Sequence, residues 1–500
     1  MTEFRRAMDR VEPGLRPAEI GTISSLGNGI AEVSGLSSVG SEEVVEFPGS
    51  VTGIAINLEP ERVGVILLGD SHELKAGLRV RATGRESDAP VGEALLGRIV
   101  DATGRPLDGG AELRSLERHP IERTAPTILE RDPVTEPLET GIQVVDALIP
   151  VGLGQRELIV GDRQTGKTTI AVDTIMNQRA KGRICVYCAI GQRSTAVARV
   201  VDRLRTHRAF EHVVVVVASD QDPPGLRFIT PYAATTMAEW FMNRGEDVLI
   251  VYDDLTRHAR AYRELSLLLR RPPGREAYPG DIFYIHSRLL ERSTHLTARR
   301  GGGSLTALPV VETQSQDISA YIPTNLISIT DGQIYLSPSL FRRGVLPAVD
   351  VGRSVSRVGG QSQRAALKRV AANLRLAYAQ FEELEIFARF ATRLDEETLR
   401  IINHGKRVRE ILKQAPGDAL TFSEQVCVLK ALESGFFSSV PLSDISKAEA
   451  TVRRTVAGAV PHLTTRIESG ETVTSEMWEA FFETCRESLP AEWVDAPGDR

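Results

Sequence analysis

The chain has 500 residues, which at roughly 100–200 residues per domain is enough for several domains and a large buried core. Its 60 basic and 66 acidic side chains give a formal net charge of -6, and no segment concentrates the basic ones. This balance argues against a protein built to bind nucleic acid. The longest apolar run, near residues 213–217, is far shorter than the ~18–20 residues that span a bilayer, and no apolar signal region follows the first residues. We therefore expect a soluble, cytoplasmic chain with no nucleic-acid partner.

Short apolar runs separated by glycines fill residues 19–85, after an N-terminal segment of residues 1–18. Ile30–Val33 and Val63–Leu68 are typical of these runs, and no long helical period interrupts them. Turns at this regular spacing predict a small β-barrel or sandwich. Because the segment contains no group of reactive side chains, we interpret it as a structural collar for assembly in preference to a ligand-binding barrel.

Residues 161–168 read Gly-Asp-Arg-Gln-Thr-Gly-Lys-Thr, which is the pattern of a phosphate-binding loop. The apolar run Glu157–Val160 precedes it and Thr169–Met176 continues without Gly or Pro, so the motif has the strand-loop-helix context that it requires. Both flanks argue against a chance match in a surface loop. Backbone amides and Lys167 are expected to bind the phosphates, and Thr168 offers a hydroxyl to Mg²⁺. The candidate nucleotide-binding residues are Gly161, Asp162, Arg163, Gln164, Thr165, Gly166, Lys167, Thr168 and Thr169.

The pair Cys185 and Cys188 has the spacing of a metal or redox site. It lies in the apolar run Arg183–Ile190, which is typical of a buried strand, and side chains three residues apart on a strand point to opposite faces. We therefore predict that both are reduced core residues.

Apolar runs alternate with helical stretches after the phosphate-binding loop, which predicts a mostly parallel sheet covered by helices within residues 86–364. One run, Asp247–Tyr252, ends in Asp253 and Asp254. An aspartate at this place is often only a turn former or a helix cap. Downstream of a phosphate-binding loop, however, it can hold the water shell of the nucleotide's Mg²⁺, and we assign that role to Asp253.

From Ala365 to the end of the chain the pattern is helical, which predicts a bundle over residues 365–500. Apolar residues recur at helical spacing at Leu367, Val370, Leu374, Ala377 and Phe381, which predicts one amphipathic helix with a core-facing stripe. Further helices are expected over Glu396–Leu412 and Thr474–Glu487.

Several stretches together resemble the alpha subunits of F-type ATP synthases. They are Gly161–Thr168, Ala189–Gln192, Tyr252–Leu255, Leu267–Asp281 and Ser354–Gly359. The resemblance spans nearly the whole chain. It implies an N-terminal β-barrel, a central RecA-like α/β nucleotide-binding domain with a mostly parallel sheet, and a C-terminal α-helical bundle. It also implies a subunit that binds ATP and Mg²⁺ and alternates with catalytic beta subunits in a hexameric ring around the gamma central stalk. A peripheral stalk and a membrane ion-translocating sector complete such enzymes, at the cytoplasmic face of the bacterial inner membrane.

Gln192 occupies the place at which the similar catalytic subunits carry a glutamate. A neutral amide cannot accept a proton from the attacking water as a carboxylate does. We therefore expect a site that binds MgATP and turns it over negligibly, with Gln192 as a polar contact.

Arg357 is the residue through which the resemblance gives this chain a part in catalysis. On sequence alone an arginine in this setting is more often a surface residue. The matching arginine of alpha subunits reaches across the interface to the phosphates in the beta site, and Ser354 and Ser356 are expected to support its placement.

Two positions depart from the usual alpha pattern near the adenine. Leu346 precedes Pro347 where alpha subunits usually have Arg-Pro, and Gln414 is followed by Ala415 and Pro416 where they usually have Gln-x-Gln. The resemblance thus keeps Gln414 as a nucleotide contact but predicts reduced contacts to the base, which leaves the selectivity for adenine open.

The N-terminal segment departs as well, since Pro13 and Pro17 interrupt it. It resembles the alpha chain of the alternative sodium- or proton-linked bacterial enzymes that lack a delta subunit. The sequence does not name the coupling ion.

An autonomous ring ATPase, such as an export ATPase or an RNA helicase, is the alternative function. Gln192 argues against it, since a self-sufficient motor needs a carboxylate there. The barrel segment also lacks the basic, aromatic-bearing surface of an RNA helicase.

Overall fold

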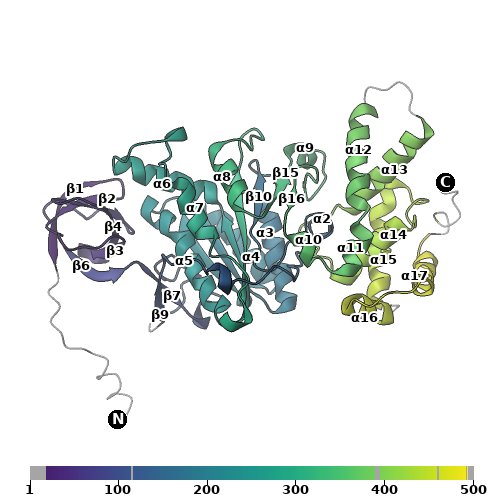
Figure 1. Cartoon of the computed structure of the whole chain (residues 1–500), viewed down its shortest axis with the longest axis horizontal. Helices are drawn as coiled ribbons and strands as arrows, with labels where there is room; N and C mark the ends of the chain where they lie inside the picture. Colours follow the sequence, from purple (N-terminus) through teal and green to yellow (C-terminus); the bar gives the residue numbers. More distant parts are fainter. Residues whose placement is uncertain (1–18, 114–115, 389–394, 459–460, 491–492, 494–500) are drawn as a thin grey trace, which may run out of the picture. The chain divides into compact units, whose positions relative to one another are not determined.

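A computed structural model describes residues 19–113, 116–388, 395–458, 461–490 and 493 (Figure 1). The predicted N-terminal segment, residues 1–18, lies outside the described residues. Two compact units are present. Residues 19–88, 221–229 and 261–279 form the first, and the remaining described residues form the second.

The first unit contains a closed six-stranded antiparallel barrel with strand order β1-β2-β5-β4-β3-β6. Alternate side chains such as Ile23, Val33, Val45 and Val65 point into its core and are almost completely buried. Closure removes exposed strand edges, so the barrel predicted from the turn spacing is confirmed. The strands are β1 (Ile20–Gly27), β2 (Ile30–Ser34), β3 (Glu43–Glu46), β4 (Thr52–Leu58), β5 (Val63–Leu67) and β6 (Arg79–Glu86).

The second unit is built on an eight-stranded sheet with the order β16-β15-β10-β14-β13-β11-β12-β8. All neighbouring strands pair in parallel except β15 and β16. Parallel strands are covered on both faces, which explains continuous apolar runs such as the valines of β12. The predicted mostly parallel sheet is confirmed. Its strands are β8 (Ile99–Val100), β10 (Glu157–Gly161), β11 (Ile184–Gln192), β12 (Val213–Ser219), β13 (Asp247–Asp253), β14 (Ser304–Glu312), β15 (Gly332–Leu336) and β16 (Val355–Ser356).

Helices connect the strands, and α3 packs on β10, β11, β13 and β14 (Figure 1). A two-stranded ribbon, β7 (Asp88–Val91) with β9 (Glu117–Pro120), lies outside the main sheet. The helices of this part of the chain are α2 (Gln143–Leu148), α3 (Lys167–Gln178), α4 (Ser194–Thr206), α5 (Pro224–Met242), α6 (Leu255–Leu268), α7 (Ile282–Leu290), α8 (Tyr321–Ile329), α9 (Pro338–Arg342) and α10 (Gly359–Ser362).

Cys185 and Cys188 lie on the buried strand β11 as free thiols. Burial raises the pKa of Cys185 to about 12, which keeps the thiol protonated and unreactive at neutral pH. Within the described ranges, no group of three or more His, Cys, Asp or Glu side chains could hold a metal ion. The prediction that the two cysteines are reduced core residues is confirmed.

Seven helices are described in the C-terminal part of the chain. They are α11 (Ala365–Ala371), α12 (Leu374–Ala388), α13 (Glu396–Ile411), α14 (Phe422–Glu433), α15 (Ile445–Gly458), α16 (Pro461–Ser469) and α17 (Ser475–Glu487). The expected helices over Glu396–Leu412 and Thr474–Glu487 correspond to α13 and α17, and Thr474 caps α17 through its side chain.

The single helix predicted from Ala365 onward is wrong, because a turn at residues 372–373 separates α11 from α12. Asn373 provides the carbonyl that begins α12, and asparagine side chains compete with helical backbone hydrogen bonds. Leu367, Leu374 and Phe381 nevertheless all enter the core, so the break preserves the apolar face. The spacing of side chains therefore could not reveal it.

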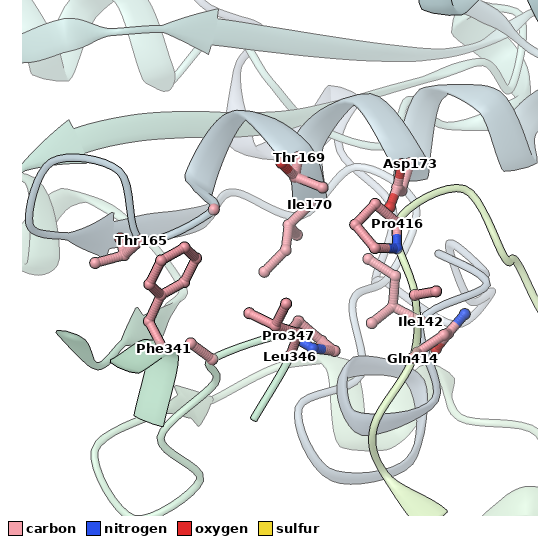
Figure 2. Close-up of a pocket in the computed structure, with 13 residues that line it drawn as sticks. Ile142, Thr165, Thr169, Ile170, Asp173, Phe341, Leu346, Pro347, Gln414 and Pro416 are labelled. Atoms are coloured by element: carbon pink, nitrogen blue, oxygen red, sulfur yellow. The ribbon is translucent and has the colours of Figure 1, made fainter. Parts of the chain in front are cut away.

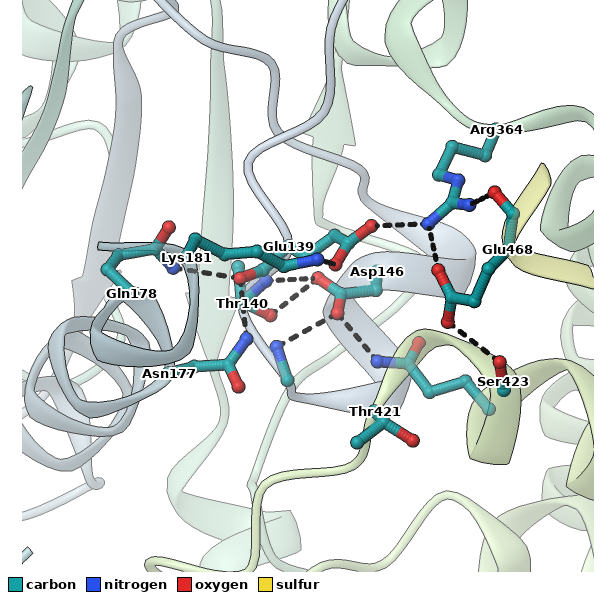
Figure 3. A network of polar contacts seen from close by, with 12 residues as sticks. Glu139, Thr140, Asp146, Asn177, Gln178, Lys181, Arg364, Thr421, Ser423 and Glu468 are labelled. Carbon is teal, nitrogen blue, oxygen red and sulfur yellow. Dashed lines mark hydrogen bonds and ion pairs between the residues drawn. The ribbon is translucent and has the colours of Figure 1, made fainter. Parts of the chain in front are cut away.

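Asp146, on α2, joins the segment before that helix to α14 in the helical part of the second unit (Figure 3). Its buried carboxylate accepts hydrogen bonds from the backbone amides of Thr140 and Gly141, both at 2.9 Å, and from the Thr140 hydroxyl at 2.6 Å. Gln425 of α14 donates a fourth, at 2.8 Å. Burial nevertheless raises the pKa of Asp146 to about 6.

Ion pairs extend this junction (Figure 3). Glu139 pairs with Lys181 at 2.8 Å and with Arg364 at 3.0 Å, and Arg364 also pairs with Glu468 of α16 at 3.0 Å. Ser423 of α14 donates to Glu468 at 2.7 Å. Polar contacts therefore connect the nucleotide-binding part of the chain, through Glu139 and Asp146, to the C-terminal helices.

No helix among the residues described here has the length and apolar content needed to cross a bilayer.

We predict that Asp146→Asn removes the part of the pH dependence of stability that comes from protonation of the Asp146 carboxyl. The pKa of about 6 in the folded chain lies above the ordinary value, so the folded protein keeps a proton that the unfolded chain releases. Lowering the pH from about 7 to about 5 therefore raises the free energy of unfolding of the parent chain by about 1 kcal/mol through this group, and the variant lacks that gain.

Urea unfolding midpoints at both pH values measure the effect. Glu433→Gln, which removes an exposed carboxylate paired with Lys430, is the control and should not change the difference. If the parent chain and Asp146→Asn differ in free energy of unfolding by the same amount at both pH values, the prediction is contradicted.

Candidate functional site

The predicted site residues converge at the carboxyl-end edge of the sheet, where four neighbouring strands terminate. In the order β10-β14-β13-β11, these strands end in the phosphate-binding loop, Glu312, Asp253 and Gln192. Ligands of open parallel sheets bind at this edge, because the connecting loops leave a crevice there. These groups line a large cavity that is open to solvent.

The backbone of the phosphate-binding loop takes a shape that requires glycine at two places. Gly166, the N-cap of α3, has a φ of 99°, in the left-handed region. A Cβ atom on Gly161 would lie 2.8 Å from the carbonyl oxygen of Leu336. Gln164 also has a positive φ, of 60°, and the Thr165 hydroxyl closes the turn by donating to the Asp162 carbonyl at 2.8 Å.

Lys167 lies at the start of α3 and is 9% exposed. Its ammonium donates to the carbonyl oxygens of Gly161 and Asp162, at 2.8 and 2.5 Å. Burial lowers the pKa of Lys167, and the nearby carboxylates of Asp254 and Glu312 oppose that effect. A buried ammonium of this kind is stabilised further by an anionic ligand such as a phosphate group.

Two side chains of the loop tie it to the segment after β14. Asp162 accepts from the Thr313 hydroxyl at 2.6 Å and from the amide of Gln316 at 2.9 Å. Arg163 forms an ion pair with Glu312. These contacts fix the loop without using its inward-pointing amides.

Asp253 accepts hydrogen bonds from three side chains. Thr168 and Tyr187 donate to Oδ2, both at 2.8 Å, and the Gln192 amide nitrogen donates to Oδ1 at 3.0 Å. Asp253 is 2% exposed, so its position is fixed by these contacts. The structure therefore brings together Thr168, Gln192 and Asp253, as the sequence predicted.

A second, smaller cavity adjoins the first (Figure 2). Gly166, Thr169 and Phe341 line both, so the two are continuous. Its other walls come from α3, from the segment after α9 and from the segment after α13. The residues are Ile142, Thr165, Ile170, Asp173, Leu346, Pro347, Ala348, Gln414, Ala415 and Pro416. Apolar groups dominate, as in most sites for planar organic ligands.

Arg357 lies elsewhere: it is exposed and lines neither cavity. Its Nη2 group donates to the carbonyl oxygens of Ile327 at 2.9 Å and Thr330 at 3.0 Å, at the carboxyl end of α8. A cation at this helix end is stabilised by the helix dipole.

Ser354, just before β16, and Ser356, within it, bond to backbone groups. The Ser354 hydroxyl donates to the Asp350 carbonyl at 2.6 Å and accepts from the amide of Tyr335 at 2.9 Å. The Ser356 hydroxyl donates to the Pro150 carbonyl at 2.6 Å. Gln155 donates to Ser356 at 3.1 Å and to the buried Glu157 at 2.7 Å.

Two side chains at the site were not predicted from the sequence. Tyr187, on the neighbouring strand β11, donates to Asp253, and Phe341, on α9, lines both cavities. The position of Tyr187 on a buried strand was compatible with ordinary core packing. Only the register between β11 and β13, in which Ala189 lies opposite Asp253, brings Tyr187 to the carboxylate.

Comparison with known protein families matches the three parts of the fold. Residues 18–84 match the ATP synthase alpha/beta family, beta-barrel domain, and residues 141–356 match the nucleotide-binding domain of that family. Residues 363–488 match the ATP synthase alpha/beta chain, C terminal domain. The chain belongs to the ATP synthase alpha/beta family.

Within this family, alpha subunits are similar over nearly the full length. The chain is 60% identical to ATP synthase subunit alpha 1 of Shewanella frigidimarina, over 97% of this chain and 94% of the relative. It is 59% identical to ATP synthase subunit alpha 2 of Albidiferax ferrireducens, over 99% and 92%. A Marinomonas ATP synthase subunit alpha 1 is 58% identical, over 97% and 96%. The family predicted from the motifs is confirmed, and the chain is an alpha subunit of a rotary F-type ATP synthase.

The family assignment shows that residues 141–356 form a nucleotide-binding domain, and it sets aside the autonomous ring ATPase. It also agrees with the prediction that the site of this alpha subunit does not catalyse hydrolysis.

We predict that Lys167→Met weakens ATP binding to the purified chain by roughly 10–100-fold, because it removes a charge-assisted contact worth about 1.5–3 kcal/mol. Isothermal titration measures the affinity. Lys181→Met is the matched control, since this exposed lysine pairs with Glu139 outside both cavities and its loss should leave ATP affinity unchanged. Unaltered binding by Lys167→Met would show that the nucleotide binds elsewhere.

Proposed function

We propose that this alpha subunit holds MgATP at its own site without hydrolysing it and supplies Arg357 to the catalytic site of a neighbouring beta subunit. The contact between Gln192 and Asp253 carries the proposal. It places a neutral amide at the end of β11, beside the phosphate-binding loop, where hydrolysis requires a group that orients or deprotonates water. The amide donates to the carboxylate that would hold the metal, but it cannot take up a proton.

Thr168 and Asp253 are proposed to hold Mg²⁺. Their hydroxyl and carboxylate oxygens meet at 2.8 Å at the edge of the phosphate cavity, and both are oxygen ligands of the type that Mg²⁺ prefers. The Thr168 hydroxyl bonds to one carboxylate, that of Asp253, which suits an ion that is shared with phosphate oxygens and waters. Bound Mg²⁺ would neutralise charge on the β- and γ-phosphates.

The placement of Arg357 supports a role in trans. Its Nη2 group donates to two carbonyl oxygens, and the residue is exposed and lines neither cavity of this chain. The planar fork suits the charge that spreads over the equatorial oxygens of a transferring phosphoryl group. The backbone contacts of Ser354 and Ser356 hold β16 and hence the start of the arginine side chain.

The assembly follows from the alpha assignment. We propose that the chain alternates with beta subunits in a hexameric ring around the gamma stalk, is held by a peripheral stalk, and lies at the cytoplasmic face of the bacterial inner membrane. There it couples ATP synthesis or hydrolysis to proton or sodium translocation in the membrane sector.

We further propose the alternative sodium- or proton-linked bacterial type without a delta subunit. The resemblance of the N-terminal segment supports this proposal, and the numerals 1 and 2 in the names of the relatives are compatible with a second synthase. Coexpression of the ring subunits with and without a delta subunit tests it: a delta subunit that copurifies with this chain would overturn it.

Thr168→Val tests the magnesium assignment. Valine keeps the shape of threonine but removes the hydroxyl, so we expect ATP to bind equally well with and without Mg²⁺. Thr174→Val on the same helix removes a hydroxyl that bonds only to the Ile170 carbonyl and should keep the magnesium effect. A variant at Thr168 that still binds MgATP more tightly than ATP would contradict the assignment.

Arg357→Ala tests the role in trans in a reconstituted alpha-beta-gamma complex. We predict that ATP hydrolysis falls by on the order of 10³-fold while the complex still assembles, because the charge on the transition state loses its partner. Arg353→Ala removes a nearby exposed arginine, which contacts Tyr335, and should keep hydrolysis within a few-fold of the parent complex. Full activity of the Arg357 variant would overturn the proposal.

A further inference from the structure

A buried carboxyl at the start of β10 has no part in the nucleotide site described above. Glu157 is 0% exposed, and its Oε1 atom has no hydrogen-bond partner among the described residues. Burial raises the pKa of Glu157 well above its ordinary value, the nearby carboxylate of Asp331 adds to this effect, and the charge of Arg357 opposes it. The surroundings therefore favour the neutral acid, at a place within electrostatic reach of Arg357.

Glu157 lies in one row with Gly332 and Ser356 across three neighbouring strands. It is opposite Gly332 of β15, and Gly332 is opposite Ser356 of β16. Residues opposite each other in a sheet direct their side chains to the same face, and the glycine leaves the middle of this row open. A Cβ atom on Gly332 would lie 2.6 and 2.8 Å from the two carboxyl oxygens of Glu157. The carboxyl thus occupies the space over Gly332, beside the strand that leads to Arg357.

Gln155 connects the Glu157 carboxyl to Ser356. Its Oε1 atom accepts from the amide of Gly152 at 2.8 Å, and its Nε2 group donates to Glu157 at 2.7 Å and to Ser356 at 3.1 Å. Ser356 also accepts from the amide of Gly359 at 3.1 Å. Because Gln155 is fully buried, loss of the acceptor on Glu157 would leave one of its N–H groups unsatisfied. Rotation of the amide to relieve that cost would break its contact with Ser356.

The backbone of Arg357 has a second attachment to the same segment. Its amide donates to the Asp331 carbonyl at 3.0 Å. The Asp331 carboxylate accepts from the backbone amide of Arg156 and from its guanidinium, both at 2.9 Å. Residues 155–157 therefore hold both the residue before Arg357 and the amide of Arg357 itself.

We propose that Glu157 is a positioning residue for Arg357. Its carboxyl fixes the Gln155 amide, the amide supports Ser356, and Ser356 sets the direction in which Arg357 leaves β16. A neutral acid adds no negative charge that would compete with phosphate for the guanidinium. The inference rests on the proposed function, since Arg357 is the group that is positioned.

Two substitutions of Glu157 in the reconstituted alpha-beta-gamma complex test this role. Glu157→Met keeps the length of the side chain but removes the acceptor, so kcat for ATP hydrolysis should fall by roughly tenfold, the rate equivalent of one buried hydrogen bond. KM should change little, because the arginine acts on the transition state. Glu157→Gln is neutral and keeps an oxygen that accepts from Gln155, so its kcat should stay within about threefold of the parent value. Glu449→Met, which removes a buried carboxyl from α15, is the control and should keep kcat.

Two further measurements separate positioning from a general structural role. Because β10 also leads into the phosphate-binding loop, the MgATP affinity of the isolated Glu157→Met chain reports whether the strand is intact, and it should equal that of the parent chain. In an Arg357→Ala background, Glu157→Met should lower kcat no further, because it acts through the arginine.

The outcomes distinguish the inference from the proposed function. The inference alone is overturned by an unimpaired Glu157→Met complex, by equal impairment of Glu157→Gln, by weakened MgATP binding to the isolated variant chain, or by a loss that persists in the Arg357→Ala background. Full activity of Arg357→Ala would overturn the proposed function and the inference with it.

Discussion

The hydrogen bond between Thr168 and Asp253 is the contact on which the rest of this site depends. It joins the first turn of α3 to the end of β13, and it exists because parallel strands place their carboxyl ends at one edge. Tyr187 and Gln192 reach the same carboxylate from β11. The aspartate is therefore held in one position before any ligand binds, as expected of a site that is largely preformed.

The same arrangement separates nucleotide binding from catalysis. The phosphate-binding loop retains its glycines, its lysine and its threonine, while the end of β11 carries an amide. Arg357 lies on a different edge of the unit, after β16, at the carboxyl end of α8. In the function proposed above, one surface of the subunit holds a nucleotide and another supplies a cation to its neighbour.

Residues whose role follows from local spacing could be predicted from the sequence. The phosphate-binding loop, Asp253 at the end of its strand and the three-part architecture are of this kind, because strand, turn and helix patterns are local. Tyr187 could not be predicted, since its contact depends on strand register. The break between α11 and α12 was missed because it keeps the apolar face. The hydrogen bond from Gln414 to the carbonyl of Gly141 could not be predicted either, because it joins segments far apart in the chain.

The fate of ATP bound to the isolated chain tests the central claim most directly. The chain is loaded with γ-labelled MgATP, freed of unbound nucleotide by gel filtration, and sampled over time for released phosphate. The account predicts that the bound nucleotide remains ATP, because Gln192 cannot activate water. Release of about one phosphate per bound ATP on the timescale of a catalytic turnover would contradict it.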